Sequence, residues 1–356
     1  MLHQRHEVLR LGLRDPFRIA RSDHDAGHRV TTVVIELTDD RFPGIVGLGE
    51  GYPDRFYGET AETIPVVLPL LLAAIREPDP TVSGLEAATA AMDRAIAHHG
   101  GAKCALDTAL HDLVGKVAGQ SVASLLDLDA DRPPTDFTLG LDEPAVVAER
   151  ARRASRFPAL KIKLGGASDL ATLEAVRAVY DGPLRVDANT GWQPDEAERL
   201  LPELERLGVE LIEQPFPADR LDQLAWLQER SPLPIVADES AVTIRDLRGL
   251  VGVVAGVNVK LAKCGGIGPA RAMLTEARQL GFRTFLGCME ETSVGIAASA
   301  VVAPLADWVD LDGNLLLADD PFAGLDLSSD CRWLRSPAPG LGVERDPRTA
   351  GMNQPA

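Results

Sequence analysis

The N-terminal third of the chain changes its hydrophobic pattern once, from alternation to helical spacing. Up to about residue 53, short runs alternate apolar and polar positions between polar turns, as in "HEVLRLGL", "VTTVVIEL" and "GIVGLGEGY". This alternation is typical of an antiparallel meander. From about residue 58 to 118, apolar residues recur every three or four positions in segments rich in Ala and Leu, which predicts helices. We therefore expect an α+β domain over residues 1–120, with helices covering a small sheet.

A different rhythm begins after the turn-rich stretch "DADRPPTD" at 128–135. Apolar runs rich in β-formers recur about every 20 to 30 residues, with helical patterns between them. Eight such runs are present: "DFTLGL", "ALKIKL", "LRVDAN", "VELIEQP", "PIVADES", "VNVKLAK", "RTFLGCME" and "DWVDLDG". Alternating strands and helices indicate parallel pairing, and eight strands favour a closed (β/α)8-type, TIM-like barrel over an open sheet. We expect the barrel over residues 121–325, followed by a C-terminal segment, 326–356, that packs on the N-terminal domain and ends in a tail that is loose after about residue 338.

Composition narrows the class of protein. The chain carries 36 basic and 53 acidic residues, a formal net charge of -17, which argues against nucleic acid or an anionic membrane as the main partner. The N-terminus lacks an apolar signal segment, and the longest apolar run, "IPVVLPLLLAAI", is too short to span a bilayer and contains proline. We expect a cytoplasmic protein. The 4 cysteines form no C-x-x-C pair, so neither a disulfide framework nor a thiolate zinc site is indicated.

Lysine is rare and concentrated in this sequence. Only 6 of the 36 basic residues are lysine, and four of these lie in "KIK" and "KLAK". A lysine can lose its proton and act as a base, whereas an arginine effectively cannot. Strand alternation places Lys161 and Lys163 on the inward face of the second barrel strand and Lys260 on that of the sixth. Lys263 is expected to fall off the inward face, in a loop or on the outer surface.

Three acidic residues end three consecutive strands. Asp187, Glu213 and Asp238 end the third, fourth and fifth strands, 26 and 25 residues apart. The carboxyl ends of barrel strands meet at one face of the barrel. Three carboxylates with no His or Cys nearby describe a site for a hard cation, so we expect Mg²⁺ rather than Zn²⁺.

The lysines lie on either side of this predicted metal site, because strands two and six face each other across a barrel. This arrangement suits abstraction of a proton α to a carboxylate: the metal stabilises the enediolate while one lysine removes the proton and the other returns it to the opposite face. The charge of Lys161 would favour a neutral Lys163 by repulsion. Asp310 and Asp312 share a face at the end of the eighth strand, and two such carboxylates imply a substrate ammonium.

These motifs resemble those of a known family. Five segments resemble motifs of the muconate-lactonizing subgroup of the enolase superfamily in order and spacing: "ALKIKLG", "VDANTGW", "IEQP", "ADES" and "NVKLAKCGG". A sixth segment, "GLGEGYPDRFYGET", resembles the glycine-rich loop of that subgroup's capping domain. Within that subgroup, "DLDG" and "GCMEETS" are similar to segments of the dipeptide epimerases, the L-Ala-D/L-Glu epimerase-like enzymes. The resemblance implies a (β/α)7β barrel with an N-terminal α+β capping domain that carries substrate-specificity loops.

The resemblance also implies roles for individual residues. Lys163 and Lys260 would be the two catalytic bases, with Lys161 as an auxiliary catalytic group near the substrate carboxylate. The metal ligands would be Asp187, Glu213 and Asp238, holding one Mg²⁺ per subunit, with Mn²⁺ able to substitute.

Substrate contacts are implied at both ends of the cavity. Asp310 and Asp312 would hold the α-ammonium of a dipeptide. Arg21 would pair with a substrate carboxylate, in a loop that also carries Asp23 and Asp25. Glu290, at a position where the family pattern suggests an apolar residue, would also contact substrate, so the second side chain could be acidic, neutral or cationic.

Two further residues, Asn189 and Glu239, are expected beside the metal ligands without binding the metal themselves. The resulting hypothesis is a Mg²⁺-dependent dipeptide epimerase that inverts the α-carbon of the C-terminal residue of an L,L-dipeptide such as L-Ala-L-Glu. We expect a homo-oligomer with a small-molecule substrate.

Other readings use the same lysines and acids. N-acylamino acid racemase, o-succinylbenzoate synthase and muconate cycloisomerase activities are alternatives, and Asp310 and Asp312 argue against them because their substrates lack a free ammonium at that end. A metal-dependent small-molecule binding module is the non-enzymatic alternative. The presence of both Lys163 and Lys260 beside all three acids disfavours it.

Overall fold

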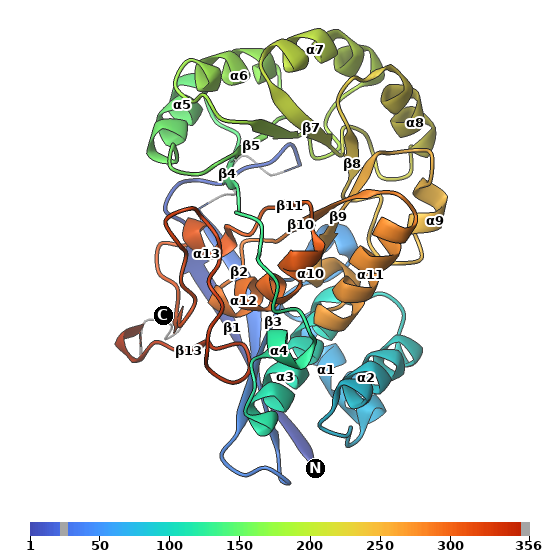
Figure 1. Ribbon diagram of the computed structural model, residues 1–356, viewed down its shortest axis with the longest axis vertical. Coiled ribbons are helices and arrows are strands. Elements are labelled where there is room, and N and C mark those ends of the chain that lie inside the picture. The colour runs from blue at the N-terminus through green and yellow to red at the C-terminus, as the bar shows by residue number, and fades with distance from the viewer. Residues whose placement is uncertain (22–27, 350–356) are drawn as a thin grey trace.

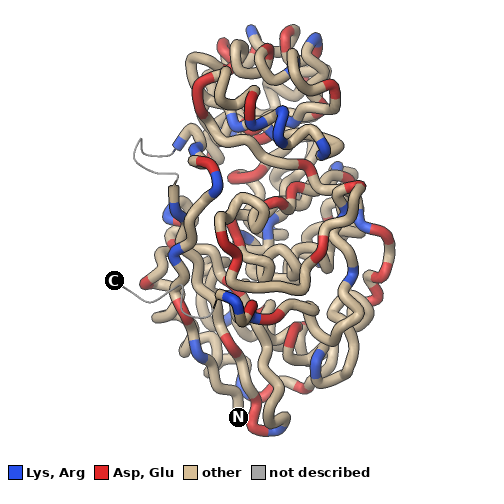
Figure 2. The backbone as a smooth tube through the Cα atoms, turned by 90° about the vertical axis from the view of Figure 1, so that its left-hand side faces the viewer, with Lys and Arg blue, Asp and Glu red and all other residues tan. Residues whose placement is uncertain are grey.

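The computed structural model describes residues 1–21 and 28–349. Within these residues the chain forms an antiparallel sheet covered by helices at one end and a barrel of parallel strands at the other (Figure 1). No helix in these two ranges is both long and apolar enough to cross a membrane. Figure 2 shows basic segments interspersed with acidic ones, so positive charge is spread along the described chain.

The N-terminal sheet has its three described strands in the order β1-β2-β3, antiparallel throughout. Its elements are β1 Leu2–Gly12, β2 Arg29–Asp39, β3 Val46–Gly51, η1 Arg55–Tyr57, α1 Thr63–Ile75, α2 Val82–Ala95 and α3 Gly100–Ala118. Strand β2 buries Val33, Ile35 and Leu37 in one apolar cluster with the helices, while Val34 belongs to the main core shared with the barrel. The alternation of a strand explains this division between two faces.

Strand β3 carries a glycine at every second position because α3 lies directly on it. A Cβ at Gly49 would lie 2.0 Å from the carbonyl oxygen of Ala105, and Gly47 and Gly51 meet α3 backbone at 2.2 and 2.4 Å. These glycines are therefore packing residues within a strand. The motif "GLGEGYPDRFYGET", expected as a glycine-rich loop, is strand up to Gly51, and only its later part is loop.

Replacing one of these glycines is expected to destabilise the protein. Gly49→Ala should lower the free energy of unfolding by about 1–3 kcal/mol or more, because the methyl group must push α3 off the sheet. Thermal unfolding followed by circular dichroism measures the effect. Gly249→Ala is the control, since a Cβ there has no atom within 4 Å. Equal melting temperatures for the two variants would contradict the packing argument.

The barrel contains the eight parallel strands expected from the sequence, adjacent in chain order. They are β4 Phe137–Leu139, β5 Leu160–Lys163, β6 Leu184–Asp187, β7 Val209–Glu213, β8 Ile235–Ala237, β9 Gly256–Lys260, β10 Arg283–Gly287 and β11 Trp308–Val309. A parallel bridge between Thr135 and Val309 joins the first strand to the last. The predicted (β/α)7β barrel with an N-terminal α+β unit is therefore confirmed.

Helices lie between consecutive strands on the outside of the barrel (Figure 1). They are α5 Pro144–Arg153, α6 Asp169–Arg177, α7 Pro194–Arg206, α8 Leu221–Arg230, α9 Leu247–Leu250, α10 Leu261–Cys264, α11 Ile267–Gln279 and α12 Ser293–Val302, the last continued by η2 Ala303–Leu305. Outward positions such as Ile162, Val186 and Val259 are fully buried in the main core. The inward positions form two layers. An apolar layer, made of Leu211, Val236, Phe285 and Trp308, lies beneath a layer of charged side chains.

The C-terminal segment returns to the N-terminal unit. Its elements are α13 Gly313–Leu316, β12 Phe322–Ala323, β13 Glu344–Arg345 and η3 Pro347–Thr349. The short helix α4, Val122–Leu125, follows α3 in the N-terminal part of the chain. The Leu341 amide donates to Asp112 on α3, and Arg345 pairs with Glu7 and Glu36 on the sheet. The tail expected to be loose after about residue 338 is instead packed at Leu341 and Val343, which are buried, and its last residues, 350–356, lie outside the described residues.

Candidate active site

The charged layer lies at the carboxyl ends of the barrel strands. Lys161 and Lys163 are on β5, Asp187 ends β6, Glu213 ends β7, and Lys260 ends β9. Asp238 follows β8 directly. The sequence placed all of these side chains inward, and their mutual contacts show that they do face one another.

Asp187, Glu213 and Asp238 form a compact carboxylate cluster. One oxygen from each lies within 4.8 Å of the others, and each residue is at most 1% exposed. The backbone N–H of Asn189 donates to Asp187 Oδ1 at 2.9 Å, and the side-chain Nδ2 of Asn258 donates to Glu213 Oε1 at 2.6 Å. One oxygen of Asp187 and one of Glu213 are thus held in place by the protein.

The donor set fits a hard divalent cation. Glu213 Oε2 is buried and accepts no hydrogen bond from a described residue, although Lys161 Nζ lies 2.8 Å away. Burial, together with the nearby charges of Asp187 and Asp238, raises the pKa of Glu213 to about 7. Mutual repulsion of this kind is relieved when a cation joins the carboxylates. Oxygen-only donors suit Mg²⁺.

Lys163 and Lys260 lie on opposite sides of this cluster. Lys163 Nζ donates to Asp187 Oδ2 at 2.6 Å, and Lys260 Nζ donates to Asp238 Oδ2 at 2.8 Å. Burial lowers the pKa of Lys260, but the charge of Asp238 outweighs burial and raises it above the ordinary value. Both lysines line the cavity described below, so a substrate there would have one amine on each side.

Lys161 is surrounded by carboxylates. Its Nζ lies 2.7 Å from Asp310, 2.8 Å from Glu213 and 3.5 Å from Asp187. Burial opposes the charge of Lys161, yet these carboxylates, Asp310 foremost, raise its pKa well above the ordinary value. The charge of Lys161 is therefore offset by acids of three other strands.

The expectation for Lys263 was wrong. Its side chain is buried, pairs with Asp238 Oδ1, and donates to the carbonyl oxygens of Asp238, Ala241 and Asn258 at 2.7, 3.0 and 2.9 Å. Helix α10 begins directly after β9, so strand alternation stops at Lys260. The helical turn directs Lys263 back against the metal-ligand candidate Asp238.

Asp310 and Asp312 lie at the end of the short strand β11. Thr138 on β4 donates to both, through Oγ1 to Asp310 at 2.9 Å and through its amide to Asp312 at 2.6 Å. Burial opposes ionisation of Asp310, but Lys161 outweighs burial and lowers its pKa. Burial and the charge of Asp310 raise the pKa of Asp312 well above the ordinary value. The charge of Lys161 also acts on Asp312, but burial and the charge of Asp310 outweigh it there.

A cavity of about 740 Å³ opens over this layer and is lined by both parts of the chain. Arg21 lines it, pairs with Glu239, and lies with its guanidinium 4.4 Å from the centre of the Phe56 ring. Glu290 lines the same cavity, and Tyr52 Oη donates to its Oε2 at 2.8 Å. Asn189 approaches Glu239 at 3.5 Å. The neighbouring Asp23 and Asp25 lie outside the described residues.

The N-terminal unit is fixed to the barrel next to this cavity by Glu50 of β3. Its carboxylate accepts hydrogen bonds from the Thr292 amide and hydroxyl, the Gly295 amide and the Thr32 hydroxyl. The start of α12 is thereby joined to the N-terminal sheet. Glu50, Tyr52 and Thr138 escaped the sequence analysis, because their importance depends on partners more than 150 residues away. Only Asn258 gave a sequence signal, since it shares the inward face with Lys260.

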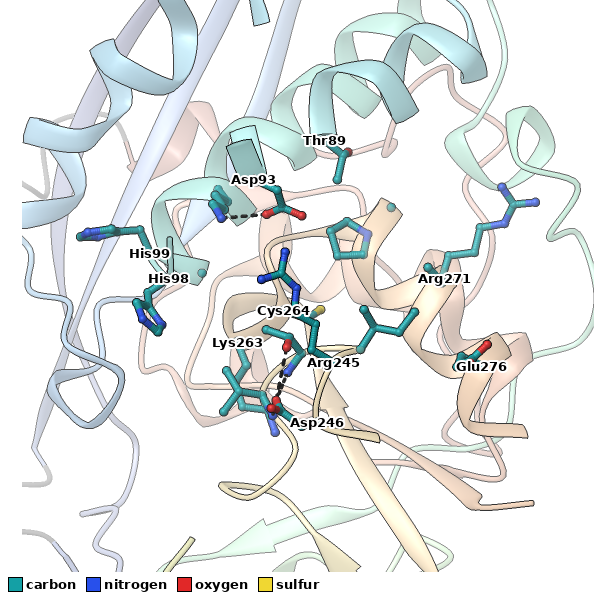
Figure 3. A pocket seen from close by; sticks show the side chains of 18 of the residues that line it. Thr89, Asp93, His98, His99, Arg245, Asp246, Lys263, Cys264, Arg271 and Glu276 are labelled. Carbon is teal, nitrogen blue, oxygen red and sulfur yellow. Dashed lines mark hydrogen bonds and ion pairs between the residues drawn. The ribbon is translucent and has the colours of Figure 1, made fainter. Parts of the chain in front are cut away.

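A larger cavity of about 1460 Å³ lies beside the barrel, between α2, α3 and α11. Figure 3 shows His98 and His99 on one side of it and Arg271 and Glu276 on the other. Its Asp93 is paired with Lys103 at 2.7 Å. The cavity is separate from the carboxylate cluster, of which it reaches only the flanking residues Glu239 and Lys263.

A closed barrel with a carboxylate cluster and two flanking lysines at its strand ends defines a metal-dependent enzyme of the enolase type. Residues 7–127 match the "Mandelate racemase / muconate lactonizing enzyme, N-terminal domain" family, and residues 145–349 match the "Enolase C-terminal domain-like" family. The chain belongs to the mandelate racemase and muconate lactonizing enzyme family of the enolase superfamily.

Proteins with assigned activities are similar over nearly the whole chain. The L-Ala-D/L-Glu epimerase of Bacteroides thetaiotaomicron is 38% identical, over 88% of this chain and 82% of that protein. The L-Lys-D/L-Arg epimerase of Methylococcus capsulatus is 34% identical, over 92% and 94%. The crystal structure of the dipeptide epimerase from Enterococcus faecalis, complexed with Mg and L-Leu-L-Tyr, superposes with a TM-score of 0.87 at 32% identity, over 97% of this chain and 99% of that one.

Proposed function

We propose that the protein is a Mg²⁺-dependent isomerase that epimerises dipeptides at the α-carbon of their C-terminal residue. The observation that carries this proposal is the position of Lys163 and Lys260 on either side of the Asp187, Glu213 and Asp238 cluster. Epimerases that act on L-Ala-Glu and on Lys-Arg dipeptides are among the similar proteins. They share a dipeptide substrate and differ in its side chains.

Lys163 and Lys260 exchange protons with the substrate from opposite faces. A neutral amine on one face takes the α-proton, and the ammonium on the other face delivers a proton to the same carbon, so the configuration inverts and the protein gains no net proton. When bound to the three carboxylates, Mg²⁺ supplies positive charge next to the substrate carboxylate, where negative charge develops. Lys161 adds fixed positive charge at the same place.

The remaining polar residues orient the substrate and the metal ligands. Asp310 and Asp312 hold the α-ammonium at the far end of the dipeptide. Asn189 fixes Asp187 through its amide. Glu239 pairs with Arg21. In this position the Arg21 guanidinium can contact a carboxylate on the second residue of the dipeptide.

Removing divalent metal is expected to abolish activity. Three mutually repelling carboxylates cannot bind a substrate carboxylate without a cation between them. Chelation followed by Mg²⁺ titration should restore turnover, with Mn²⁺ as a substitute, and calorimetry should show one Mg²⁺ per subunit. Glu213→Gln should weaken that binding, whereas the exposed Glu229→Gln should leave it unchanged. Full activity after exhaustive metal removal would contradict the metal assignment.

A screen of L,L-dipeptide pools in D₂O with Mg²⁺ tests the proposed reaction directly. Each epimerised dipeptide gains one deuterium at its second α-carbon, because the returned proton comes from a lysine that has exchanged with solvent. Mass spectrometry measures the gain. If no dipeptide gains mass, the proposed function is wrong.

A cytoplasmic location and a homo-oligomeric state also remain predictions.

A further inference from the structure

Two carboxylates at one end of the cavity, Asp312 and Glu290, have no ion pair with a described residue. Among residues 1–21 and 28–349, Asp310 pairs with Lys161, but neither Asp312 nor Glu290 has an ion pair with a lysine, arginine or histidine. Both line the cavity together with Asp310. Asp312 is buried and Glu290 is half-buried, and a carboxylate that is shielded from water is stabilised by a cationic ligand.

Glu290 lies next to the aspartate pair. It follows β10, the strand that pairs with β11. Gly313, directly after Asp312, is packed so closely on this segment that a Cβ there would lie 2.2 Å from the Met289 carbonyl oxygen and 2.9 Å from the Glu291 nitrogen. Glu290 therefore belongs to the end of the cavity that holds Asp310 and Asp312.

The Glu290 carboxylate is held in place from the N-terminal unit. Tyr52 Oη donates to its Oε2 at 2.8 Å, and Tyr52 directly follows β3, which Glu50 ties to α12. Burial and the charge of Glu290 raise the pKa of Tyr52 well above its ordinary value, so the phenol keeps its proton and remains a donor. Three exposed arginines also line the cavity, Arg10, Arg29 and Arg55. Arg10 and Arg55 lie near Glu62, and none of the three forms an ion pair with Glu290.

We propose that this end of the cavity selects a dipeptide whose first residue has a cationic side chain, with Glu290 as the residue that pairs with that side chain. The inference rests on the proposed function, in which Asp310 and Asp312 take the α-ammonium. Asp310 is already joined to Lys161, whereas Glu290 has no ion pair with a cation among the described residues and is open to one from the substrate. A lysine or arginine at the first position supplies two positive charges, its α-ammonium and its side chain.

A matched pair of substrates tests the proposal on the unmodified protein. An L-lysyl and an L-norleucyl dipeptide differ at the first residue only in the terminal ammonium, and their second residue is the one best turned over in the dipeptide screen. We expect kcat/KM to be about 10- to 100-fold higher for the lysyl dipeptide, as for a charge-assisted hydrogen bond in a site built to receive it. Equal values, or a preference for norleucine, would overturn the proposal.

Variants assign the preference to Glu290. Glu290→Gln should bring the lysyl-to-norleucyl ratio close to one, and Glu290→Met should invert it, while the exposed Glu229→Gln should leave it unchanged. Tyr52→Phe should raise KM for the lysyl dipeptide more than it lowers kcat, because Tyr52 only positions the carboxylate. A ratio unaffected by Glu290→Gln would refute the assignment. Absence of turnover for every dipeptide would instead contradict the proposed function.

Discussion

Lys163→Ala and Lys260→Ala are each expected to reduce epimerisation by on the order of 10² to 10⁴-fold, the usual contribution of a positioned acid or base. Inversion needs an amine on both faces of the α-carbon, so the loss of either lysine stops it. Each variant keeps one amine, and we expect it to exchange the α-proton of a single stereoisomer with D₂O. The two variants should prefer opposite stereoisomers at the second residue, which nuclear magnetic resonance can measure.

Two further variants separate the role of the amine from the effect of its charge. Lys163→Arg keeps the positive charge near Asp187 but cannot serve as a base, so it should be as inactive as the alanine variant. Lys103→Ala is the control, because Lys103 pairs with Asp93 in the larger cavity, away from the proposed site. If Lys163→Ala and Lys260→Ala both epimerise at the unmodified rate, the two-base mechanism is wrong.

Blocking the substrate's amine is expected to cost on the order of 2 to 5 kcal/mol in kcat/KM, about 30- to 4,000-fold, since it leaves buried charge unpaired. Asp310 and Asp312 are 4% and 2% exposed and lie at the end of the cavity where the ammonium is proposed to bind. The measurement compares a free L,L-dipeptide with its N-acetyl form. Equal values would remove the dipeptide assignment and favour an N-acylamino acid racemase.

Substitution of the aspartates should reproduce the effect from the protein side. In Asp312→Asn the free dipeptide should lose most of its advantage over the acetylated one, because the amide keeps the shape but not the charge. Asp310→Asn should have a larger effect, since it also removes a partner of Lys161. The exposed Asp319→Asn is the matched control on the following loop. A full advantage of the free dipeptide in Asp312→Asn would place the ammonium elsewhere.

The barrel and its charged layer could be predicted because both follow from short-range regularities. Strand alternation puts Lys161, Lys163 and Lys260 on inward faces. A spacing close to one β/α unit brings Asp187 and Glu213 to adjacent strand ends, and the structure pairs them in register. Such regularities are properties of a few neighbouring residues and of a repeat, so they can be read without knowing the fold.

The features that the sequence could not predict depend on where helices and strands end and on the contacts between them. The inward position of Lys263 follows from α10 starting directly after β9, which strand alternation does not foresee. The β3 glycines looked like a loop because the approach of α3 is a tertiary contact.

The lysines could be placed from the sequence, whereas the contacts of the other cavity residues could be found only in the tertiary structure. The sequence alone determined the barrel, the candidate metal ligands and the candidate bases, because these lie at equivalent positions of a repeated β/α unit. Only the tertiary structure decided that Lys161 is offset by three acids, that Tyr52 holds Glu290, and that Arg21 is held by Glu239. These pairs join residues from 26 to more than 200 positions apart, and no local pattern of side chains encodes the distance between two such charges.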